Sequence, residues 1–397
     1  MKIDHVHFYV EDARAWRNWF VHKLGFHARG SGSNGSHTCT EVVNSGAIYF
    51  VISSPLTPLS PVAEFLRQHP PGVADVAFCV EDVAAVMIKA QASGVQILQP
   101  IQDQQDHKWG KIKAWGSLTH TLIERPEVRG TEEQRSRGAG EIDIYPLTPQ
   151  HQLLQAGEPV QRTGSLSPLT PQRQLSQVGK HSVDTERNSP LTFTGIDHIV
   201  LNVEKGDLGR AVAWYEDVLG FHSRQSFKIQ TDRSALSSQV MSHHKGVQFP
   251  INQPASPNSQ IQEFLDANRG AGIQHIALQI PNIVQAIARF RSGGVSFLPV
   301  PPSYYTQLQS RQGLPLRADQ LAQIAAQQIL VDWQETNPDA LLLQTFTQPI
   351  FNQPTFFFEI IERRSQAVGF GEGNFRALFE AIEREQIKRG NNNLQGK

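Results

Sequence analysis

The sequence predicts an α+β fold built from a duplicated unit, with helices packed on curved sheets. The first observation is length, because 397 residues suffice for two domains. The second is a repeat: IDHVHFYVEDARAWRNWFVHKLGFH at 3–27 is matched by IDHIVLNVEKGDLGRAVAWYEDVLGFH at 196–222. The third is a further matching pair at 72–98 and 272–298. A period of about half the chain favours a duplicated domain over a solenoid.

Each copy is expected to contain two strand–helix–strand modules. An apolar run rich in Ile and Val begins each module and predicts a buried strand. An amphipathic helix follows, and a glycine marks the turn after it. These glycines are Gly25, Gly94, Gly220 and Gly294. Matching LIER and IIER segments, at 122–125 and 360–363, are expected to end the two copies.

The repeat divides the chain into an N-terminal domain at 1–129, a linker or insertion at 130–192 and a C-terminal domain at 193–397. The middle segment is rich in Gln, Ser, Thr, Pro and Gly, and PLTPQ occurs in it twice. Low apolar content favours a poorly ordered segment. We expect an exposed, functionally inert insertion; a partner-binding segment is the alternative.

Composition excludes several classes of protein. The formal net charge of −1 predicts neither nucleic-acid nor membrane binding. The two cysteines, Cys39 and Cys79, form no CxxC pair, which fits a reducing, cytoplasmic compartment. The N-terminus has no signal-peptide pattern, and no apolar run approaches the length of a membrane helix.

Three ionisable residues lie inside apolar runs of the second copy: His198 in GIDHIVLNV, His275 in GIQHIALQI and Glu359 in FFFEIIER. Burying such groups is costly unless something compensates them. Two imidazoles and one carboxylate are the ligands of non-haem Fe(II) oxygenases. A structural zinc site would want a fourth ligand, often Cys, and neither cysteine lies in this copy.

The first copy differs at the corresponding positions. His5 matches His198, but Asp75 matches His275 and Thr121 matches Glu359. It therefore keeps only one of the three candidate ligands, and we interpret it as a metal-free structural half.

Neutral polar and aromatic residues near the three candidate ligands predict a pocket for a substrate. Amides can hydrogen-bond a phenol or a carboxylate without adding charge beside a metal. Phenylalanines form core or a flat apolar slot for an aromatic ring. Strict strand alternation points Gln274 away from His275. GFGEGNF at 369–375 precedes an amphipathic helix that we expect to close over the site as a lid.

The second half resembles the 4-hydroxyphenylpyruvate dioxygenases of the vicinal oxygen chelate superfamily. The resemblance rests on GIDHIVLNV, FPINQP, SQIQEFLDANRGAGIQHIAL, PVPPSYYTQL, LLLQTFTQP, FFFEIIER and GFGEGNFRALFEAIE, in the family's order over about 195–390. It implies two open, β-barrel-like domains, of which the first is metal-free. The repetitive 130–192 segment replaces the family's usual connection.

The resemblance also implies the site. Fe(II), one ion per chain, would be held by His198, His275 and Glu359, and no side chain would serve as a nucleophile. The implied substrate-binding residues are Ser238, Asn252, Gln260, Gln274, Gln344, Phe346, Phe357, Phe370, Asn374 and Phe375. The implied reaction converts 4-hydroxyphenylpyruvate and O2 to homogentisate and CO2, through oxidative decarboxylation, ring hydroxylation and side-chain migration. A homo-oligomer, dimer or tetramer, is implied too.

Three alternatives remain. Hydroxymandelate synthase uses the same substrate but oxidises the benzylic carbon, and Phe375 favours ring attack because the matching position in that group tends to be aliphatic. A non-catalytic binding protein of this fold would not need the ligand set. A glyoxalase-like isomerase would use an additional carboxylate. The sequence leaves open whether homogentisate feeds tyrosine and phenylalanine breakdown or tocopherol and plastoquinone synthesis.

Overall fold

The computed structural model describes residues 1–34, 37–104, 106–125, 191–231, 233–244, 246–311, 313–334 and 337–394. We call 1–125 the N-terminal half and 191–394 the C-terminal half. The insertion predicted at 130–192 lies outside the described residues except for its last two positions. Within the described part, no helix combines the length and apolarity that crossing a membrane requires.

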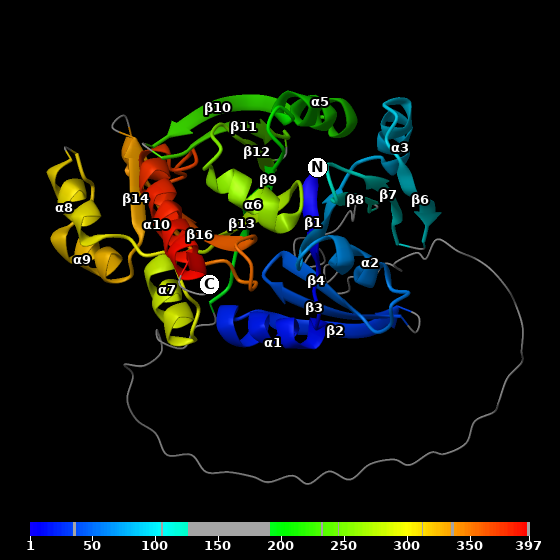
Figure 1. The fold of residues 1–397 in the computed structure, drawn as a ribbon, viewed down its shortest axis with the longest axis horizontal. Helices are drawn as coiled ribbons and strands as arrows, with labels where there is room; N and C mark the ends of the chain where they lie inside the picture. The colour runs from blue at the N-terminus through cyan, green and yellow to red at the C-terminus, as the bar shows by residue number, and fades with distance from the viewer. Residues whose placement is uncertain are drawn as a thin grey trace, which may run out of the picture.

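The N-terminal half forms one curled sheet with helices on its outer side (Figure 1). Its elements are β1 (Lys2–Tyr9), α1 (Ala13–Leu24), β2 (His27–Asn34), β3 (Thr38–Ser45), β4 (Ile48–Pro55), α2 (Pro61–Gln68), β5 (Gly72–Cys79), α3 (Val83–Ala92), β6 (Ile97–Asp103), β7 (Lys108–Lys113) and β8 (Thr119–Glu124). The strand order is β2-β3-β4-β1-β5-β8-β7-β6.

The C-terminal half repeats this plan and adds helices to it. Its elements are β9 (Gly195–Asn202), α5 (Leu208–Leu219), β10 (His222–Gln230), β11 (Ala235–Ser242), β12 (Gln248–Pro254), α6 (Gln260–Asn268), β13 (Gly272–Gln279), α7 (Ile283–Ser292), α8 (Pro302–Ser310), α9 (Ala318–Ala326), β14 (Leu330–Gln334), β15 (Asn337–Phe346), β16 (Phe357–Arg363), η1 (Glu372–Asn374) and α10 (Phe375–Leu394). The order β10-β11-β12-β9-β13-β16-β15-β14 reproduces that of the first sheet. The predicted duplicated α+β fold is therefore confirmed.

The helices end where the sequence predicts. The N-cap Asp12 accepts hydrogen bonds from the backbone of Arg14 and Ala15, which satisfies free N–H groups at the start of α1. Gly25 and Gly220 end α1 and α5 in the left-handed conformation, with φ of 74° and 70°. A side chain would be strained at such a φ, so glycine stops the helix there.

The central strands of the two sheets pair in the same register. His5 on β1 lies opposite Ala77 on β5, and His198 on β9 lies opposite Ala277 on β13. In each half the other central strand, β5 or β13, also pairs in parallel with β8 or β16 respectively. Equivalent positions of the two halves can therefore be compared residue by residue.

Aromatic side chains from both halves form one continuous core. The rings of Phe8 and Phe356 lie 5.3 Å apart edge to face, and those of Phe50 and Phe358 stack at 5.9 Å. Phe8, Phe50 and Phe358 are at most 1% exposed. Paired aromatic rings contribute more to stability than the burial of their apolar surface alone. This contact therefore stabilises the packing of the two halves against each other.

A second contact between the halves is polar. His120 on β8 lies within 3.1 Å of the Tyr215 hydroxyl on α5, measured from Nε2. Its Nδ1 donates to the Val76 carbonyl at 2.9 Å. Both side chains are fully buried, and this pairing satisfies groups that would otherwise be costly to bury.

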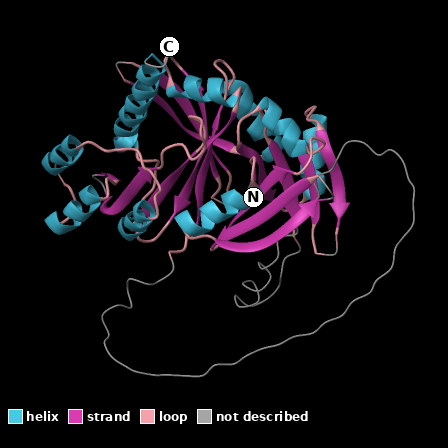
Figure 2. Cartoon of the chain, turned by 60° about the horizontal axis from the view of Figure 1, so that its bottom comes forward, coloured by secondary structure: helices cyan, strands magenta, loops and turns pink. Residues whose placement is uncertain are grey.

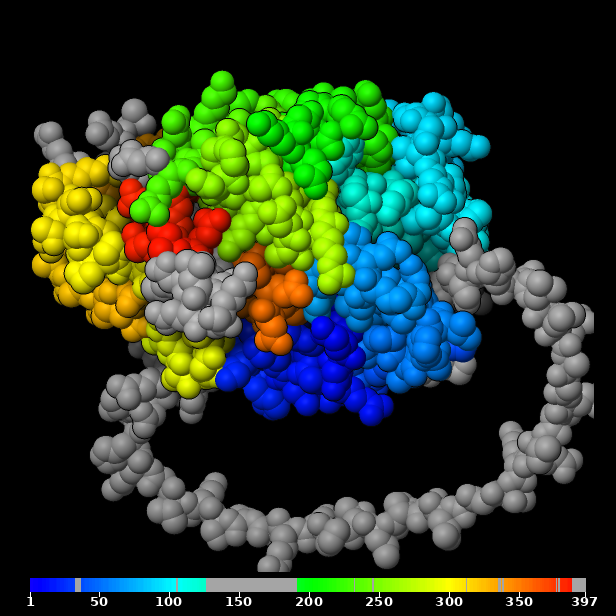
Figure 3. Space-filling view, in the orientation of Figure 1, coloured from blue at the N-terminus to red at the C-terminus, as the bar shows by residue number. Residues whose placement is uncertain are grey.

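The last helix lies across the C-terminal sheet, with the other helices outside the strands (Figure 2). In the space-filling view the red part of α10 lies beside the green and lime segments that carry β10 and α6 (Figure 3). No described element of the N-terminal half occupies the equivalent place. This difference decides how open the two halves are.

Candidate metal centre

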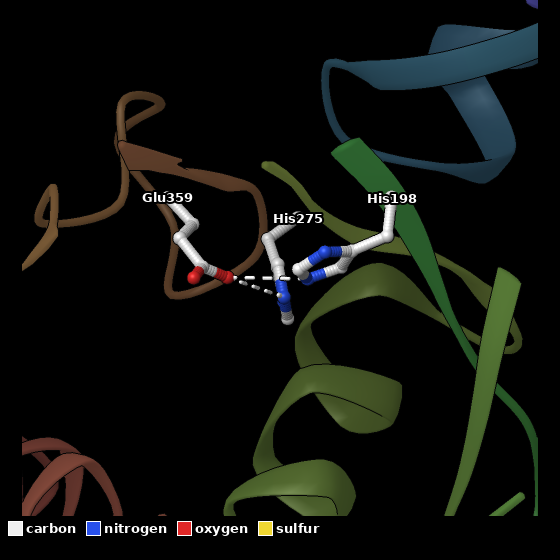
Figure 4. Close-up of side chains that lie close together, drawn as sticks. All are labelled: His198, His275 and Glu359. Atoms are coloured by element: carbon white, nitrogen blue, oxygen red, sulfur yellow. Dashed lines mark ion pairs between the residues drawn. The ribbon is translucent and has the colours of Figure 1, made fainter. Parts of the chain in front are cut away.

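His198, His275 and Glu359 converge from three adjacent strands, β9, β13 and β16 (Figure 4). The register explains why, because Ala277 on β13 lies opposite both His198 and Glu359. The Nε2 atoms of His198 and His275 lie 3.2 Å and 3.7 Å from Oε2 of Glu359. The three side chains are buried. Among the described residues, this is the only cluster of three or more His, Cys, Asp or Glu side chains that could hold a metal ion.

The donor set fits a divalent iron. Two imidazole nitrogens and one carboxylate on one face leave the other face open, which is the arrangement of non-haem Fe(II) oxygenases. The second carboxylate oxygen of Glu359, Oε1, is buried and has no hydrogen-bond partner among the described residues. A buried, unpartnered carboxylate oxygen is expensive, and a cation would compensate it.

The pKa values of the histidines also indicate a cation site. Burial lowers the pKa of His198, but the carboxylates of Glu359 and Asp197 outweigh it and raise the value to about 9. Burial, followed by the charge of His198, lowers the pKa of His275 well below its usual range. One positive charge is therefore held between these ligands, and a metal ion would replace the proton of His198.

An outer layer of side chains orients His198. Asp197 accepts a hydrogen bond from Nδ1 of His198 at 2.9 Å, so Nε2 faces the site. Arg363 donates to both oxygens of Asp197, at 2.6 and 2.8 Å. Burial raises the pKa of Asp197, but the hydrogen bonds from Arg363 and His198 lower it well below its usual range. The carboxylate therefore remains ionised.

Arg363 also fixes the loop that covers the site. Its Nη1 donates to the carbonyls of Ala367 and Gly369, just before Phe370. The ring of Phe370 lies 5.2 Å from that of His198, edge to face. The orientation of a candidate ligand and the position of the covering loop thus depend on the same guanidinium group.

The expectation that Gln274 points away from His275 is wrong. The β9–β13 pairing shifts register between Ile273 and His275, which is a bulge in the strand. A bulge breaks strict alternation, so Gln274 and His275 both line the pocket. Oε1 of Gln274 lies 3.2 Å from Nδ1 of His275 and accepts a hydrogen bond from it.

The pocket beside the candidate ligands is a small cavity of about 90 Å³. Almost all of the predicted substrate-binding residues line it: Ser238, Asn252, Gln260, Gln274, Gln344, Phe346, Phe357, Phe370 and Phe375. Asn374 does not; it is buried and accepts a hydrogen bond from the Tyr304 hydroxyl at 2.8 Å. The structure places Asn374 as a support for α8 rather than in the wall.

Two amides in the wall retain free acceptors. Oε1 of Gln260 and Oε1 of Gln344 are buried without a hydrogen-bond partner among the described residues. Both amides face a pocket whose other walls are mostly apolar. A polar group of a bound molecule would satisfy them. Gly371 has a φ of +77°, and a Cβ there would lie 2.1 Å from Oε1 of Gln344. Glycine is therefore required for the covering loop to approach this amide.

Helix α10 closes the pocket. Phe375, Phe379 and Ile382, spaced along one face of the helix, line the cavity. The Phe375 ring packs edge to face on Phe227 at 5.0 Å. This packing accounts for the small volume.

The sequence reasoning missed Asp197 and Arg363, and it missed apolar wall residues such as Val200 and Pro250. A signal for the first pair was present: IDH and IER occur in both copies, and Asp4 and Arg125 form the equivalent ion pair at 3.0 Å. The wall residues carry no such signal, because an apolar strand residue looks the same in a core and in a pocket.

Comparison with known proteins agrees with this geometry. The family described as "Glyoxalase/Bleomycin resistance protein/Dioxygenase superfamily" matches residues 2–114 and 195–311. The 4-hydroxyphenylpyruvate dioxygenase of Coccidioides posadasii is 35% identical over 98% of the chain and 93% of its own length. That of Caenorhabditis briggsae is also 35% identical, over 98% and 92%.

A solved structure of similar fold is a triple mutant of 4-hydroxymandelate synthase from Streptomyces coelicolor. Its TM-score is 0.74 at 26% identity, and the match covers 97% of this chain and 98% of the other. The two catalytic specificities considered from the sequence are thus both represented among similar proteins, with the dioxygenases at higher identity.

Proposed function

We infer that this chain, which belongs to the 4-hydroxyphenylpyruvate dioxygenase family, converts 4-hydroxyphenylpyruvate and O2 to homogentisate and CO2. The observation that carries this conclusion is identity of 35% to such dioxygenases over 98% of the chain. The ligand cluster supports it, because a binding protein would have no need of two buried histidines aimed at one carboxylate.

We propose that His198, His275 and Glu359 hold Fe(II). When bound, the ion would supply the chemistry that protein side chains lack: it would bind the 2-oxo acid and activate O2. No side chain is then needed as a nucleophile. The hydrogen bond of Asp197 to Nδ1 keeps Nε2 of His198 available, and the Gln274 amide does the same for His275.

The pocket residues would bind and orient the substrate. The free acceptors of Gln260 and Gln344 suit the phenol of 4-hydroxyphenylpyruvate, which is a hydrogen-bond donor. Phe357 stacks on His275 at 4.8 Å and, with Phe370 and Phe375, forms flat apolar walls for the ring. Helix α10 would exclude water during turnover and open as a lid to admit substrate.

Hydroxymandelate synthase is the second candidate, favoured by the fold similarity alone. The discriminating position is Phe375, which lines the pocket from α10. A bulky ring there restrains the aromatic end of the substrate and favours attack on the ring.

One experiment separates the candidates. The protein is loaded with Fe(II) without oxygen, mixed with 4-hydroxyphenylpyruvate and then exposed to O2. The products are separated by chromatography and identified by mass spectrometry. Homogentisate with stoichiometric CO2 supports the proposal. Hydroxymandelate would reassign the chain to the synthases, and no turnover would favour a binding protein.

A Phe375→Val variant sharpens the same test. Removing the ring is expected to raise the share of hydroxymandelate among the products. Ile387→Val is the matched control, because Ile387 lies on the same helix but is exposed and does not line the pocket. An unchanged product ratio in Phe375→Val would contradict the role given to this ring.

Domain boundaries, cellular location and oligomeric state are proposed from the sequence. We propose domains at 1–129 and 193–397 joined by the 130–192 insertion, a cytoplasmic location and a homo-oligomeric state.

A further inference from the structure

A cavity larger than the pocket at the candidate metal centre lies in the N-terminal half, whose described residues include no metal-ligand set. Its volume is about 920 Å³, against about 90 Å³ for the pocket at the candidate metal centre. His5, His7 and Tyr9 of β1 line it, together with Lys111 of β7 and Thr121 of β8. The mechanism proposed above uses none of these residues.

Strand register makes this cavity the counterpart of the catalytic pocket. His5 corresponds to His198, because these residues lie opposite Ala77 and Ala277. Thr121 corresponds to Glu359, and their cross-strand partners are Lys111 and Phe346 respectively. A lysine of the N-terminal half therefore occupies the position of an aromatic pocket residue of the C-terminal half.

Lys111 supplies a fixed positive charge to the cavity. Its Nζ lies 3.4 Å from Oδ1 of Asp75, which is buried and also accepts from the Thr119 hydroxyl at 2.5 Å. Asp75 lies behind Lys111 and does not line the cavity. Burial lowers the pKa of Lys111, but Asp75 outweighs it and the net shift is upward. The ammonium group therefore stays charged where the other half would hold a metal ion.

The rest of the lining also favours an anion. Lys113, Arg67 and Arg269 line the cavity with Lys111, while Glu64 is the one acidic residue in the described lining. Glu64 is exposed and forms an ion pair with Arg67. The pKa of His7 lies well below its usual range because it is buried, so its ring is neutral. A carboxylate entering the cavity would meet the positive charges of its lining, and the buried Asp75 that pairs with Lys111 does not line the cavity.

The apolar part of the lining fits a flat ring. Tyr9 packs edge to face on Phe65 at 5.3 Å, and Trp109 and Val51 complete this wall. A further wall comes from Arg269–Ala271 of the C-terminal half, directly before the strand that carries His275. Arg269 donates to the Arg67 carbonyl at 3.0 Å. A bound molecule would thus contact both halves.

We propose that the N-terminal half binds a small aromatic monocarboxylate, with Lys111 pairing with its carboxylate and Trp109, Tyr9 and Phe65 contacting its ring. The proposed role is binding alone, because among the described residues the lining holds no group of three metal ligands.

The test titrates the iron-loaded full chain, without oxygen, with 4-hydroxyphenylacetate. This probe has an aromatic ring and a carboxylate but no 2-oxo group to chelate iron. Tryptophan fluorescence is the readout, and Trp109→Phe identifies the part of the signal that comes from the cavity. We expect saturable binding that weakens at least about tenfold for the uncharged 4-hydroxyphenylacetamide.

Charge variants complete the test. Lys111→Gln alone leaves Asp75 unpaired and is liable to unfold, so Asp75→Asn/Lys111→Gln is used with it to remove both charges together. At least about tenfold weaker binding is expected in the double variant. Lys108→Gln, on the same strand but outside the cavity, should bind like the parent. Absence of saturable binding, equal affinity for acid and amide, or unchanged affinity in the double variant would overturn the proposal.

Discussion

The two halves of this chain share one strand order and one register but differ in what fills the centre of each sheet. In the C-terminal half, two histidines and a glutamate meet under α10. In the N-terminal half, Asp75 replaces one histidine and Thr121 replaces the glutamate, and Lys111 turns in to pair with Asp75. The two halves thus keep one backbone scaffold but place different charged groups at its centre, a candidate metal-ligand set in one half and a lysine–aspartate pair in the other.

The supporting residues were kept in both halves. Asp4 pairs with His5 and Arg125 as Asp197 pairs with His198 and Arg363. The carboxylates of Glu124 and Glu362 each accept a hydrogen bond from the first backbone N–H of a helix earlier in the same half, α3 or α7. These interactions orient strands and cap helices whatever lies in the cavity, so they persist where the candidate ligand set does not.

The largest expected effect breaks the comparison at the ligand itself. Glu359→Ala should lose bound iron and reduce O2 uptake to background while the fold is retained, because two histidines alone hold iron poorly. Metal content and oxygen consumption measure it, with circular dichroism to verify folding. Glu11→Ala, an exposed glutamate of the N-terminal half, is the control. An active, iron-replete Glu359→Ala would refute the ligand assignment.

The next effect concerns stability and pH. Burial lowers the pKa of His120 from 6.5 to about 4. Between these values the unfolded chain binds more protons, so the free energy of unfolding falls as pH drops from about 6.5 to about 4, by about 3 kcal/mol. The equivalent residue of the C-terminal half is Phe358, which does not titrate and therefore adds no pH dependence to stability.

His120→Phe therefore tests that difference. The variant should lose this share of the acid destabilisation, which denaturant unfolding at several pH values measures. The expected result is a flatter dependence of the free energy of unfolding on pH than in the parent. An identical pH dependence in the two proteins would remove His120 as its source.

A smaller effect is expected at the residue behind His198. Asp197→Asn weakens the hydrogen bond that orients the imidazole, and such outer partners contribute about 10–100-fold in metal affinity or activity. Asp4→Asn changes the equivalent residue of the N-terminal half and should leave turnover unaltered. Iron titration of both variants gives the answer, and equal losses would mean that the aspartates act only through folding.

The smallest effect is expected from deleting about residues 145–185, inside the predicted insertion. The cost of closing a loop changes slowly with its length, so turnover should be nearly unchanged. Steady-state kinetics and size-exclusion chromatography of the shortened chain measure this. Collapse of activity or solubility would show that the segment is required by the fold.

Much of the fold and the candidate site could be predicted from local signals. Apolar runs, caps and the internal repeat predict the duplicated α+β architecture, since the hydrophobic period reports which face of each element is buried. His198, His275 and Glu359 stand out because ionisable groups inside such runs need compensation. The first copy keeps a histidine at one of these positions, and Asp75 and Thr121 show from the sequence alone that the other two ligands are absent there.

Tertiary structure decided what alternation could not. The bulge at Gln274 turns that amide into the pocket, because strand pairing rather than sequence period sets the local register. Asn374 supports Tyr304 because α8 lies beside it. The position of α10 makes the pocket at the candidate metal centre the smaller of the two cavities, and the pairing of β7 with β8 brings Lys111 to Asp75. The sequence by itself determined which residues needed a partner; only long-range packing determined which partner each one met.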